Sequence, residues 1–416
     1  MLGYTTFQLI FLITALAAGL YMAWNIGAND LANSMSSAVG AKAITHKQAV
    51  VIASVITMAG AILAGEHVTS TVKVGIFDTT AIDDPNKLAI GALAAVTAAG
   101  IWITIATWKA LPISTSHSIV GGMLGYGLLA GGTGIISWGT LGRIITSWIT
   151  SPIFGAIGAF LIFKLIVRVI FDSKTPFITA KKFVPYFLGI TVFIISLSLL
   201  YNTSLSFRIF GEKLSLMHAL FYSIFPAVLI GYFGKNPVLA GVEDGEGIEG
   251  VEDVFRRLQI LTSCYVAFSF GANNVGNAMG PVVLIIHSIL GTTDLPFFLS
   301  SEILLLVGGI GLAIGISTWG YKVIQTVGFN LTALTNTRGF SVDFGAATVM
   351  LVAAMMGMPI STSHTVVGSV LGVGLARGVE AIDLSVIRRI IISWLITVPI
   401  AALSSVGLYL GITLII

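Results

Sequence analysis

The chain has 416 residues, of which 56% are hydrophobic and only 9% are charged, whereas about 25% of the residues of a soluble domain are charged. Its mean hydropathy of +0.98 and its repeated apolar runs predict an all-α polytopic membrane protein. The net charge of +3, without a basic tract, gives no sign of a nucleic-acid partner. A single cysteine, Cys264, excludes an intrachain disulfide and any cysteine-cluster metal site.

The first half of the chain alternates apolar runs with short polar motifs. Tyr4–Trp24 lacks the basic start and the cleavage site of a signal peptide, so we expect it to be a retained membrane span. It leads into an asparagine-rich motif, Asn25–Asn33, and a later span leads into the sequence PISTSH at Pro112–His117. The other apolar runs of this half are Val50–Ala64, Leu88–Trp108 and Ile144–Ile170.

The middle of the chain has a different composition. Its densest basic cluster contains Lys164, Arg168, Lys174, Lys181 and Lys182. Two further apolar runs follow, near Pro185–Leu200 and Leu216–Phe233, and then an acidic, glycine-rich loop at Gly241–Asp253. A charge run of this kind is typical of a solvated linker, and a regulatory role is the alternative.

The second half repeats four blocks of the first, in the same order and at a nearly constant offset. The pairs are Gly27–Asn33 with Gly271–Asn277, Gly65–Val72 with Gly320–Val327, Pro112–His117 with Pro359–His364, and Arg143–Trp148 with Arg389–Trp394. Duplication of this kind is typical of secondary transporters. We therefore expect one repeat at residues 1–171, a linker with two extra spans at residues 172–253, and a second repeat at residues 254–416.

The positive charges predict an orientation. If the basic cluster at Lys164–Lys182 is cytoplasmic, Arg256 and Arg257 are cytoplasmic too, and the loop with Lys42 and Lys47 is inside only if the N-terminus is outside. The repeats then have inverted topology. We expect about twelve transmembrane helices with discontinuous or re-entrant segments, and a cytoplasmic central acidic loop.

The two PISTSH motifs place hydroxyl-rich helix starts in an apolar chain. An unpaired buried ion costs on the order of tens of kcal/mol by Born estimates, so a carrier must replace the water around an anion with other donors. Hydroxyls and the free N–H groups of helix starts supply them. One such motif could merely bridge helices, but two copies favour an anion site, with the candidates Ser114, Thr115, Ser116, Ser361, Thr362 and Ser363.

The asparagine-rich motifs supply amide and carboxylate oxygens at helical spacing. Oxygen ligands of this kind suit Na⁺, and the amides of Asn29 and Asn273 are further candidates for contact with the anion. Asp30 has no lysine or arginine close in sequence, and an intramembrane carboxylate is a functional candidate by default; a carboxylate that caps a broken helix is the alternative. The predicted Na⁺ ligands are Asp30, Asn33, Asn274 and Asn277, with Gln325 as a weaker candidate.

Other polar residues leave alternatives open. His117 and His364 fit hydrogen bonds between helices better than a proton relay, and a nucleophilic Ser–His pair is excluded because no orienting acid or oxyanion partner accompanies it. Glu66, His67 and Lys73 fit either an ion gate or a loop at the membrane surface.

In combination, these motifs resemble the inorganic phosphate transporter (PiT) family, which includes the sodium–phosphate symporters. The resemblance rests on GANDLAN, on LQILT followed by GANNVGNAMGP, on VIQT and on the paired PISTSH, and it extends from about Trp24 to the C-terminus. It implies phosphate as substrate, cation symport and a homodimer. Many relatives carry aspartate in both asparagine-rich motifs, where this chain has Asn274, and some eukaryotic relatives carry a carboxylate at the position of Ser70. Both differences bear on the number and identity of the coupled ions.

We therefore expect a secondary active transporter of the cell membrane that imports inorganic phosphate with Na⁺, and not an enzyme; no cofactor is expected beyond the coupling ion. The nearest alternative is proton-coupled uptake of phosphate or of a metal–phosphate complex, in which Asp30 takes up the proton. An anion channel is an alternative of another class, and uphill accumulation driven by Na⁺ distinguishes it from a symporter.

Overall fold

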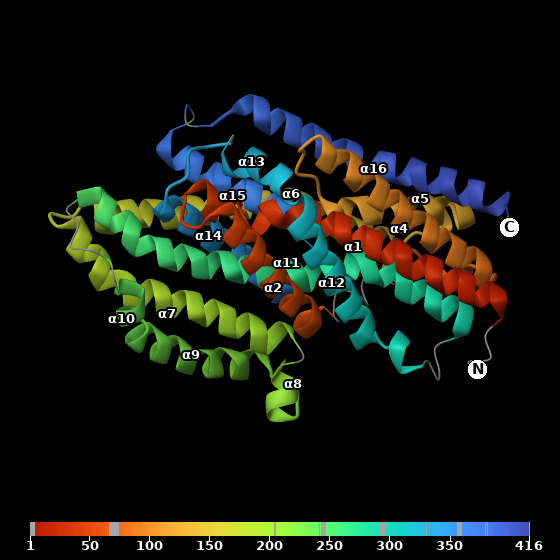
Figure 1. Ribbon diagram of the computed structural model, residues 1–416, viewed down its shortest axis with the longest axis horizontal. Helices are drawn as coiled ribbons and strands as arrows, with labels where there is room; N and C mark the ends of the chain where they lie inside the picture. Colours follow the sequence, from red (N-terminus) through yellow and green to blue (C-terminus); the bar gives the residue numbers. More distant parts are fainter. Residues whose placement is uncertain are drawn as a thin grey trace.

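The computed structural model describes residues 5–65, 75–203, 205–240, 242, 247–291, 296–329, 331–355, 360–378, 380 and 382–415. Within these ranges the regular secondary structure is helical apart from one isolated β-bridge between Phe77 and Ile136 (Figure 1). Nine helical segments of the described chain are long and apolar enough to cross a membrane. The prediction of an all-α polytopic membrane protein is therefore confirmed, while the total of about twelve spans, the inverted topology and the repeat boundaries stay predictions.

The described helices follow the blocks of the sequence. The first half contains α1 (Thr6–Gly40), α2 (His46–Ala64), α4 (Pro85–Trp108), α5 (Thr115–Gly131) and α6 (Trp138–Ile166), with the short turns η1 (Thr79–Ala81) and η2 (Gly132–Ile135) and the π-helical η3 (Val167–Phe171). The middle contains α7 (Pro176–Asn202), α8 (Leu205–Phe210), α9 (Leu216–Phe233) and α10 (Lys235–Leu239). The second half contains α11 (Gly247–Leu290), η4 (Phe297–Leu299), α12 (Ser301–Trp319), α13 (Tyr321–Gly328), α14 (Asn336–Met355), α15 (Thr362–Arg377) and α16 (Leu384–Thr413).

Two long helices carry the asparagine-rich motifs. α1 has 35 residues and α11 has 44, so α1 alone extends about 50 Å, more than the roughly 30 Å of membrane hydrocarbon. A capping box starts α1, since the Thr5 hydroxyl accepts from the backbone N–H of Gln8 and the Gln8 side chain accepts from the backbone N–H of Thr5. Both motifs lie well inside their helices.

α4 and α5 form a hairpin. They pack against each other, and the bridge between Phe77 and Ile136 joins the segment that precedes α4 to the segment that follows α5. The chain therefore enters and leaves this hairpin at the same end, and Lys109–Ser114 forms its tip, where Ala110 turns the chain with a left-handed φ of 54°. α14 and α15 also pack together, toward the opposite end of the molecule (Figure 1). These hairpins fit the predicted discontinuous helices.

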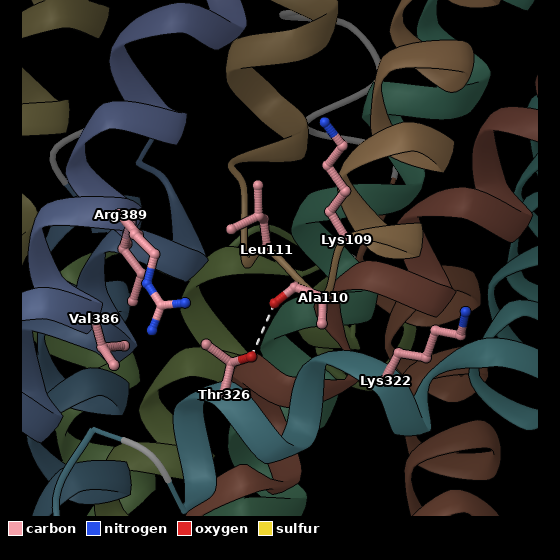
Figure 2. Close-up of a pocket in the computed structure, with 8 residues that line it drawn as sticks. Lys109, Ala110, Leu111, Lys322, Thr326, Val386 and Arg389 are labelled. Atoms are coloured by element: carbon pink, nitrogen blue, oxygen red, sulfur yellow. Dashed lines mark hydrogen bonds between the residues drawn. The ribbon is translucent and has the colours of Figure 1, made fainter.

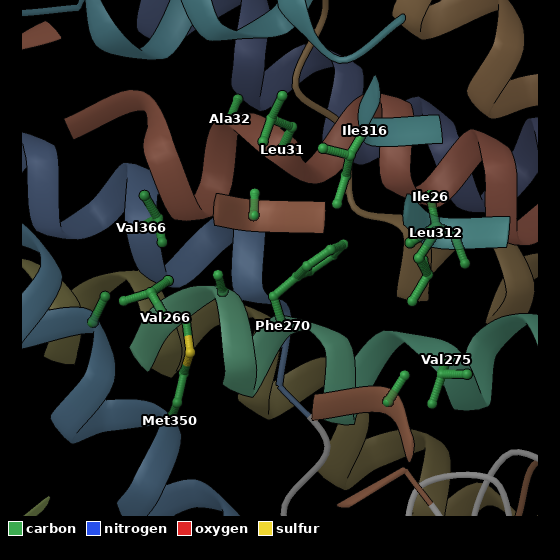
Figure 3. Packing of buried hydrophobic residues seen from close by; sticks show 14 of the residues in the cluster. Ile26, Leu31, Ala32, Val266, Phe270, Val275, Leu312, Ile316, Met350 and Val366 are labelled. Carbon is green, nitrogen blue, oxygen red and sulfur yellow. The ribbon is translucent and has the colours of Figure 1, made fainter. Parts of the chain in front are cut away.

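The first two helices of each half pack closely against helices of the other half. α1 packs on α12, while α2 packs on α11. A Cβ atom added to Gly27 would lie 2.1 Å from the carbonyl oxygen of Leu312, and one added to Gly271 would lie 2.0 Å from that of Thr57. The glycine that opens each asparagine-rich motif is thus required by close helix approach. Apolar side chains, among them Phe270 of α11, fill the space around these contacts (Figure 3).

The hydroxyl-rich helices α5 and α15 also pack against helices of the other half. α5 packs on α16 and α15 packs on α6, with Gly121 against the backbone of Val398 and Gly368 against that of Pro152.

At the end of α1, Arg256 Nε donates to the carbonyl oxygen of Ala43 at 2.8 Å. The loop after α1 and the first turns of α11, both predicted to be cytoplasmic, therefore lie at one end of the molecule, although the side of the membrane that this end faces stays a prediction.

Candidate functional site

Asp30 is a fully buried carboxylate that accepts hydrogen bonds from three helices. On its own helix, Asn33 Nδ2 donates to Asp30 Oδ1 at 2.8 Å. From the start of α5, Thr115 Oγ1 donates to Asp30 Oδ2 at 2.8 Å, and from the start of α15, Ser363 Oγ donates to Asp30 Oδ1 at 3.2 Å. The two PISTSH motifs therefore meet around one carboxylate of the first asparagine-rich motif.

Asn274 occupies the matching position in the second asparagine-rich motif. Its side-chain oxygen accepts from Asn277 Nδ2 at 3.0 Å and lies 3.2 Å from Thr115 Oγ1. Its amide nitrogen lies 3.5 Å from Thr362 Oγ1. A threonine hydroxyl has only one proton, so Thr115 can donate to Asp30 or to Asn274 but not to both. This hydroxyl thus joins the two motifs at their centre.

The last asparagine of each motif reaches the PISTSH helix of the other half. Asn33 Nδ2 donates to Ser363 Oγ at 2.8 Å, and Asn277 Nδ2 donates to Ser116 Oγ at 3.1 Å. Four predicted phosphate ligands are brought together with the four predicted Na⁺ ligands of the motifs in this way. The hydroxyls are those of Thr115, Ser116, Thr362 and Ser363.

The first serine of each PISTSH motif has a different position. Ser114 Oγ accepts from the backbone N–H of His117 and Ser361 Oγ accepts from that of His364, each at 3.3 Å. Both serines are N-caps, which satisfy one of the free N–H groups of their own helices. These two predicted phosphate ligands therefore support the helix starts.

The remaining predicted ligands lie apart from the hydroxyl cluster. Asn29 binds the tip of the α4–α5 hairpin, because its amide donates to Thr107 Oγ1 at 2.9 Å and to Leu111 O at 3.0 Å while its oxygen accepts from Ile113 N at 3.2 Å. Asn273 Nδ2 donates to Ser269 O within α11 at 2.8 Å. The side chain of Gln325 is outside the described part of the structure, as are Glu66, His67, Ser70 and Lys73.

One buried oxygen of the site has no hydrogen-bond partner among the described residues. It is Asn33 Oδ1, on the residue whose amide nitrogen donates to Asp30 and to Ser363. A buried acceptor without a donor is costly, and a cation bound beside Asp30 would satisfy it. No group of three or more histidine, cysteine, aspartate or glutamate side chains that could hold a metal occurs in the described ranges, so the donors here are amide, hydroxyl and single-carboxylate oxygens.

The two histidines of the motifs belong to one cluster of aromatic rings. The rings of His117 and His364 lie 4.5 Å apart between centroids, and each packs at 3.6 Å on a tryptophan, Trp148 for His117 and Trp394 for His364. His364 Nδ1 lies 2.9 Å from the carbonyl oxygen of Trp148. Ring contacts of the two histidines thus join α5 and α15 to α6 and α16. The predicted hydrogen bond between helices is present for His364, whereas neither ring nitrogen of His117 has a hydrogen-bond partner among the described residues.

Sequence reasoning missed Asp343 of α14, a second fully buried carboxylate. Ser37 Oγ donates to Asp343 Oδ1 at 2.6 Å, and Ser263 Oγ donates to Asp343 Oδ2 through a short hydrogen bond. Its partners therefore come from α1 and α11, the helices that carry the asparagine-rich motifs. The available signal was a single acidic residue inside an otherwise apolar stretch, the same signal that identified Asp30.

The chain is similar to known phosphate transporters over nearly its whole length. Residues 26–405 match the model of the phosphate transporter family. A Thermococcus kodakarensis protein named as a candidate phosphate permease is 47% identical over 400 residues, which are 96% of this chain and 97% of that protein. The chloroplastic inorganic phosphate transporter 2-1 of Arabidopsis thaliana is 37% identical over 92% of this chain and 69% of its own length.

A solved structure described as the sodium-dependent phosphate transporter shares the fold. It superposes with a TM-score of 0.88 at 41% identity, covering 98% of this chain and 100% of that one. The resemblance found in the motifs is therefore confirmed by the whole sequence and by the arrangement of its helices. This chain is a multi-pass membrane transporter, not an enzyme, and it belongs to the phosphate transporter family.

Proposed function

We propose that the protein imports inorganic phosphate together with Na⁺, by alternating access of its two halves. The observation that carries this proposal is the position of Asp30, a buried carboxylate among the hydroxyls of both PISTSH helices. It lies next to Asn33 Oδ1, which has no hydrogen-bond partner in the described part of the chain. The structural similarity to a sodium-dependent phosphate transporter supports it.

The phosphate is held by neutral donors. Thr115, Ser116, Thr362 and Ser363 offer hydroxyls, and the starts of α5 and α15 add backbone N–H groups and the positive ends of their helix dipoles. None of these donors carries a full charge. Such a site can replace the water around a phosphate without holding the anion too tightly to release it.

The carboxylate makes a co-bound cation necessary. Two like charges about 4 Å apart repel by roughly 4 kcal/mol at an effective dielectric constant of 20, so Asp30 alone would oppose phosphate binding. Na⁺ bound by Asp30, Asn33, Asn274 and Asn277 would reverse this effect, and each ion would then favour binding of the other. A proton on Asp30 would also remove the repulsion, which is the basis of the proton-coupled alternative.

Uptake of radiolabelled phosphate into proteoliposomes tests the proposal, with Na⁺ and H⁺ gradients imposed separately. We expect accumulation above the external concentration with the Na⁺ gradient alone. Accumulation with the H⁺ gradient alone would support proton coupling instead. Equilibration without accumulation under either gradient would identify a channel.

We also propose the orientation that the basic residues predict, with the N-terminus outside. It places Ser173 inside and Lys213 outside, so Ser173→Cys and Lys213→Cys in a Cys264→Ala background should react with a membrane-impermeant thiol reagent from opposite faces. Labelling of both from one face would contradict the scheme.

Following the family resemblance, we propose a homodimer. Light scattering of the detergent-solubilised protein should give twice the chain mass of 43.7 kDa after subtraction of the detergent. A monomer mass at every concentration would contradict it.

A further inference from the structure

A cavity lined by basic side chains lies between the two halves (Figure 2). Lys109 and Leu111 come from the tip of the α4–α5 hairpin, Lys322 and Thr326 from α13, and Arg389 from α16. Its volume is about 240 Å³, several times the roughly 30 Å³ that one water occupies in the liquid. A tetrahedral oxyanion with part of its water shell fits such a space.

The cavity adjoins the candidate site through the hairpin tip. Leu111 lines the cavity, and its carbonyl oxygen accepts from Asn29. Two residues later, Ile113 O lies 3.0 Å from Ser363 Oγ, whose single proton can be donated to Ile113 O or to Asp30 but not to both. From the other wall, α16 continues one turn beyond Ile390 to Trp394, whose indole nitrogen donates to Pro112 O at 3.1 Å. A few residues of the tip therefore separate the cavity from the hydroxyls around Asp30.

The charges in this cavity favour an anion. Lys109, Lys322 and Arg389 do not form an ion pair with any carboxylate in the described part of the chain; Lys322 Nζ lies over the ring of Trp319 instead. Asp383, which does not line the cavity, interacts electrostatically with Arg389, but hydrogen bonds from Ser385 are the main reason that the pKa of Asp383 is lowered from its ordinary value. All three cationic residues line the cavity; the Arg389 guanidinium is directed toward Thr326 and Ala110, whereas the ammonium groups of Lys109 and Lys322 extend away from them (Figure 2). Their charges around one concavity add up to a positive potential that raises the local anion concentration.

The cavity lies toward the end of the molecule that is predicted to be cytoplasmic. α13, which forms one wall, packs against the last turns of α1, where the carbonyl oxygen of Gly328 lies against Gly40. Arg389 lies near the first residues of α16, and Asp383, which caps that helix, donates its backbone N–H to Leu331 O, just beyond α13. Two of the elements that line the cavity therefore lie near the loop that follows α1.

We propose that this cavity is a second phosphate-binding site, a cytoplasmic vestibule in which Lys109, Lys322 and Arg389 hold phosphate before it re-enters or after it leaves the site at Asp30. This inference rests on the proposed function, since phosphate must be the cargo. Thr326 Oγ1 donates to Ala110 O at 2.8 Å and joins α13 to the hairpin tip across the halves (Figure 2). Phosphate in the vestibule would thus bind next to a contact that alternating access must rearrange.

Phosphate exchange in oriented membrane vesicles tests the vestibule. Right-side-out and everted vesicles expose one face each, and equal Na⁺ on both sides removes the driving gradient. In the triple variant Lys109→Gln, Lys322→Gln, Arg389→Gln, the KM for phosphate applied from the cytoplasmic face should rise about tenfold at low ionic strength. The KM from the outer face should change less than twofold, and added salt should shrink the cytoplasmic effect because it screens the charges.

A matched control removes the same number of positive charges from the same predicted end. Lys164, Arg168 and Lys174 are exposed on α6, η3 and the following turn, and their replacement by glutamine should leave both KM values near those of the wild type. Thermal unfolding in detergent checks that each triple variant folds, and Arg389→Gln alone should give a smaller cytoplasmic effect.

Three outcomes separate the two proposals. Wild-type vesicles that exchange no phosphate would overturn the proposed function itself. Exchange with the same KM values in the wild type and the Lys109, Lys322 and Arg389 variant would overturn only the vestibule. An equal rise in KM from both faces would also overturn it, because the three cations would then act on the whole transporter rather than on one entrance.

Discussion

The two asparagine-rich motifs share a geometry but differ in charge. In α1, Asp30 accepts from Asn33 and lies beside Thr115 and Ser363. In α11, Asn274 accepts from Asn277 and lies beside Thr115 and Thr362. The hydroxyls, the amides and the opening glycine correspond, and only the first motif has a carboxylate at the centre.

This difference distinguishes the residues that helix packing requires from a residue that packing does not require. Close packing requires a glycine in both motifs, and each helix start requires its serine cap, so these features occur twice. A carboxylate is not required by packing, since an amide fills the same position in α11. The negative charge of Asp30 is the feature that the proposed Na⁺ site would account for, and exchanging the two side chains tests this.

Asp30→Asn makes the motifs nearly equal and should have the largest effect. Without the carboxylate, the proposed Na⁺ site loses the only formal charge among its ligands, so Na⁺-driven accumulation of phosphate in proteoliposomes should be abolished. Phosphate binding should weaken mainly because the cation is lost. Asp78→Asn is the control, because Asp78 is a loop carboxylate whose bonds go to Thr80; it should accumulate phosphate normally.

Ser363→Ala and Ser116→Ala test whether both halves contribute to one anion site. A hydrogen bond to a charged group contributes about 1.5–3 kcal/mol, so each change should raise the KM for phosphate roughly ten- to a hundredfold. Ser118→Ala is the matched control, since this buried serine donates to Ser114 O within α5. An unchanged KM in both test variants, measured in the same uptake assay, would remove these serines from the site.

Gly27→Ala and Gly271→Ala test the shared packing. Each added methyl group would meet a backbone oxygen of the facing helix, and overpacking of this kind costs about 1–3 kcal/mol. Both variants should unfold at a lower temperature in detergent. Gly142→Ala, with nothing within 4 Å of the added Cβ atom, should unfold at or above the wild-type temperature. A drop for only one of the two motif glycines would show that the packing is less symmetric than the contacts indicate.

Asn274→Asp should have the smallest effect. It adds a carboxylate to an arrangement of amides and hydroxyls that matches the one around Asp30, so Na⁺-driven uptake should persist with a change of a few fold in the KM for Na⁺. Complete loss of uptake would mean that the second motif cannot accept a charge, and that the halves differ in more than one side chain.

Much of this arrangement could be predicted from the sequence, because a motif that occurs twice in the same context is rarely accidental. Two PISTSH copies predicted that Thr115 and Ser363 face one site; both hydroxyls lie within hydrogen-bond distance of Asp30, and their role as phosphate ligands stays a prediction. The roles of Ser114 and Asn29 were not evident, since a cap and a ligand use the same side-chain types, and only the fold shows which acceptor or donor is near.

Asp343 was missed for a different reason. It stands alone in its helix, without a repeated motif around it, and its partners Ser37 and Ser263 are distant in sequence. The three basic side chains of the cavity at Lys109 likewise come from three separate helices. Periodicity and motif spacing describe one helix at a time, so contacts of this kind appear only when the helices are packed.

Equilibrium binding of radiolabelled Na⁺ to the purified protein, with and without phosphate, tests the role of Asp30 most directly. In the wild type, phosphate should raise the affinity for Na⁺, because each ion reduces the electrostatic cost of the other. In Asp30→Asn, Na⁺ affinity should fall and phosphate should no longer raise it. Equal Na⁺ binding in the two proteins, with the same response to phosphate, would show that the cation binds elsewhere and that Asp30 is a structural carboxylate.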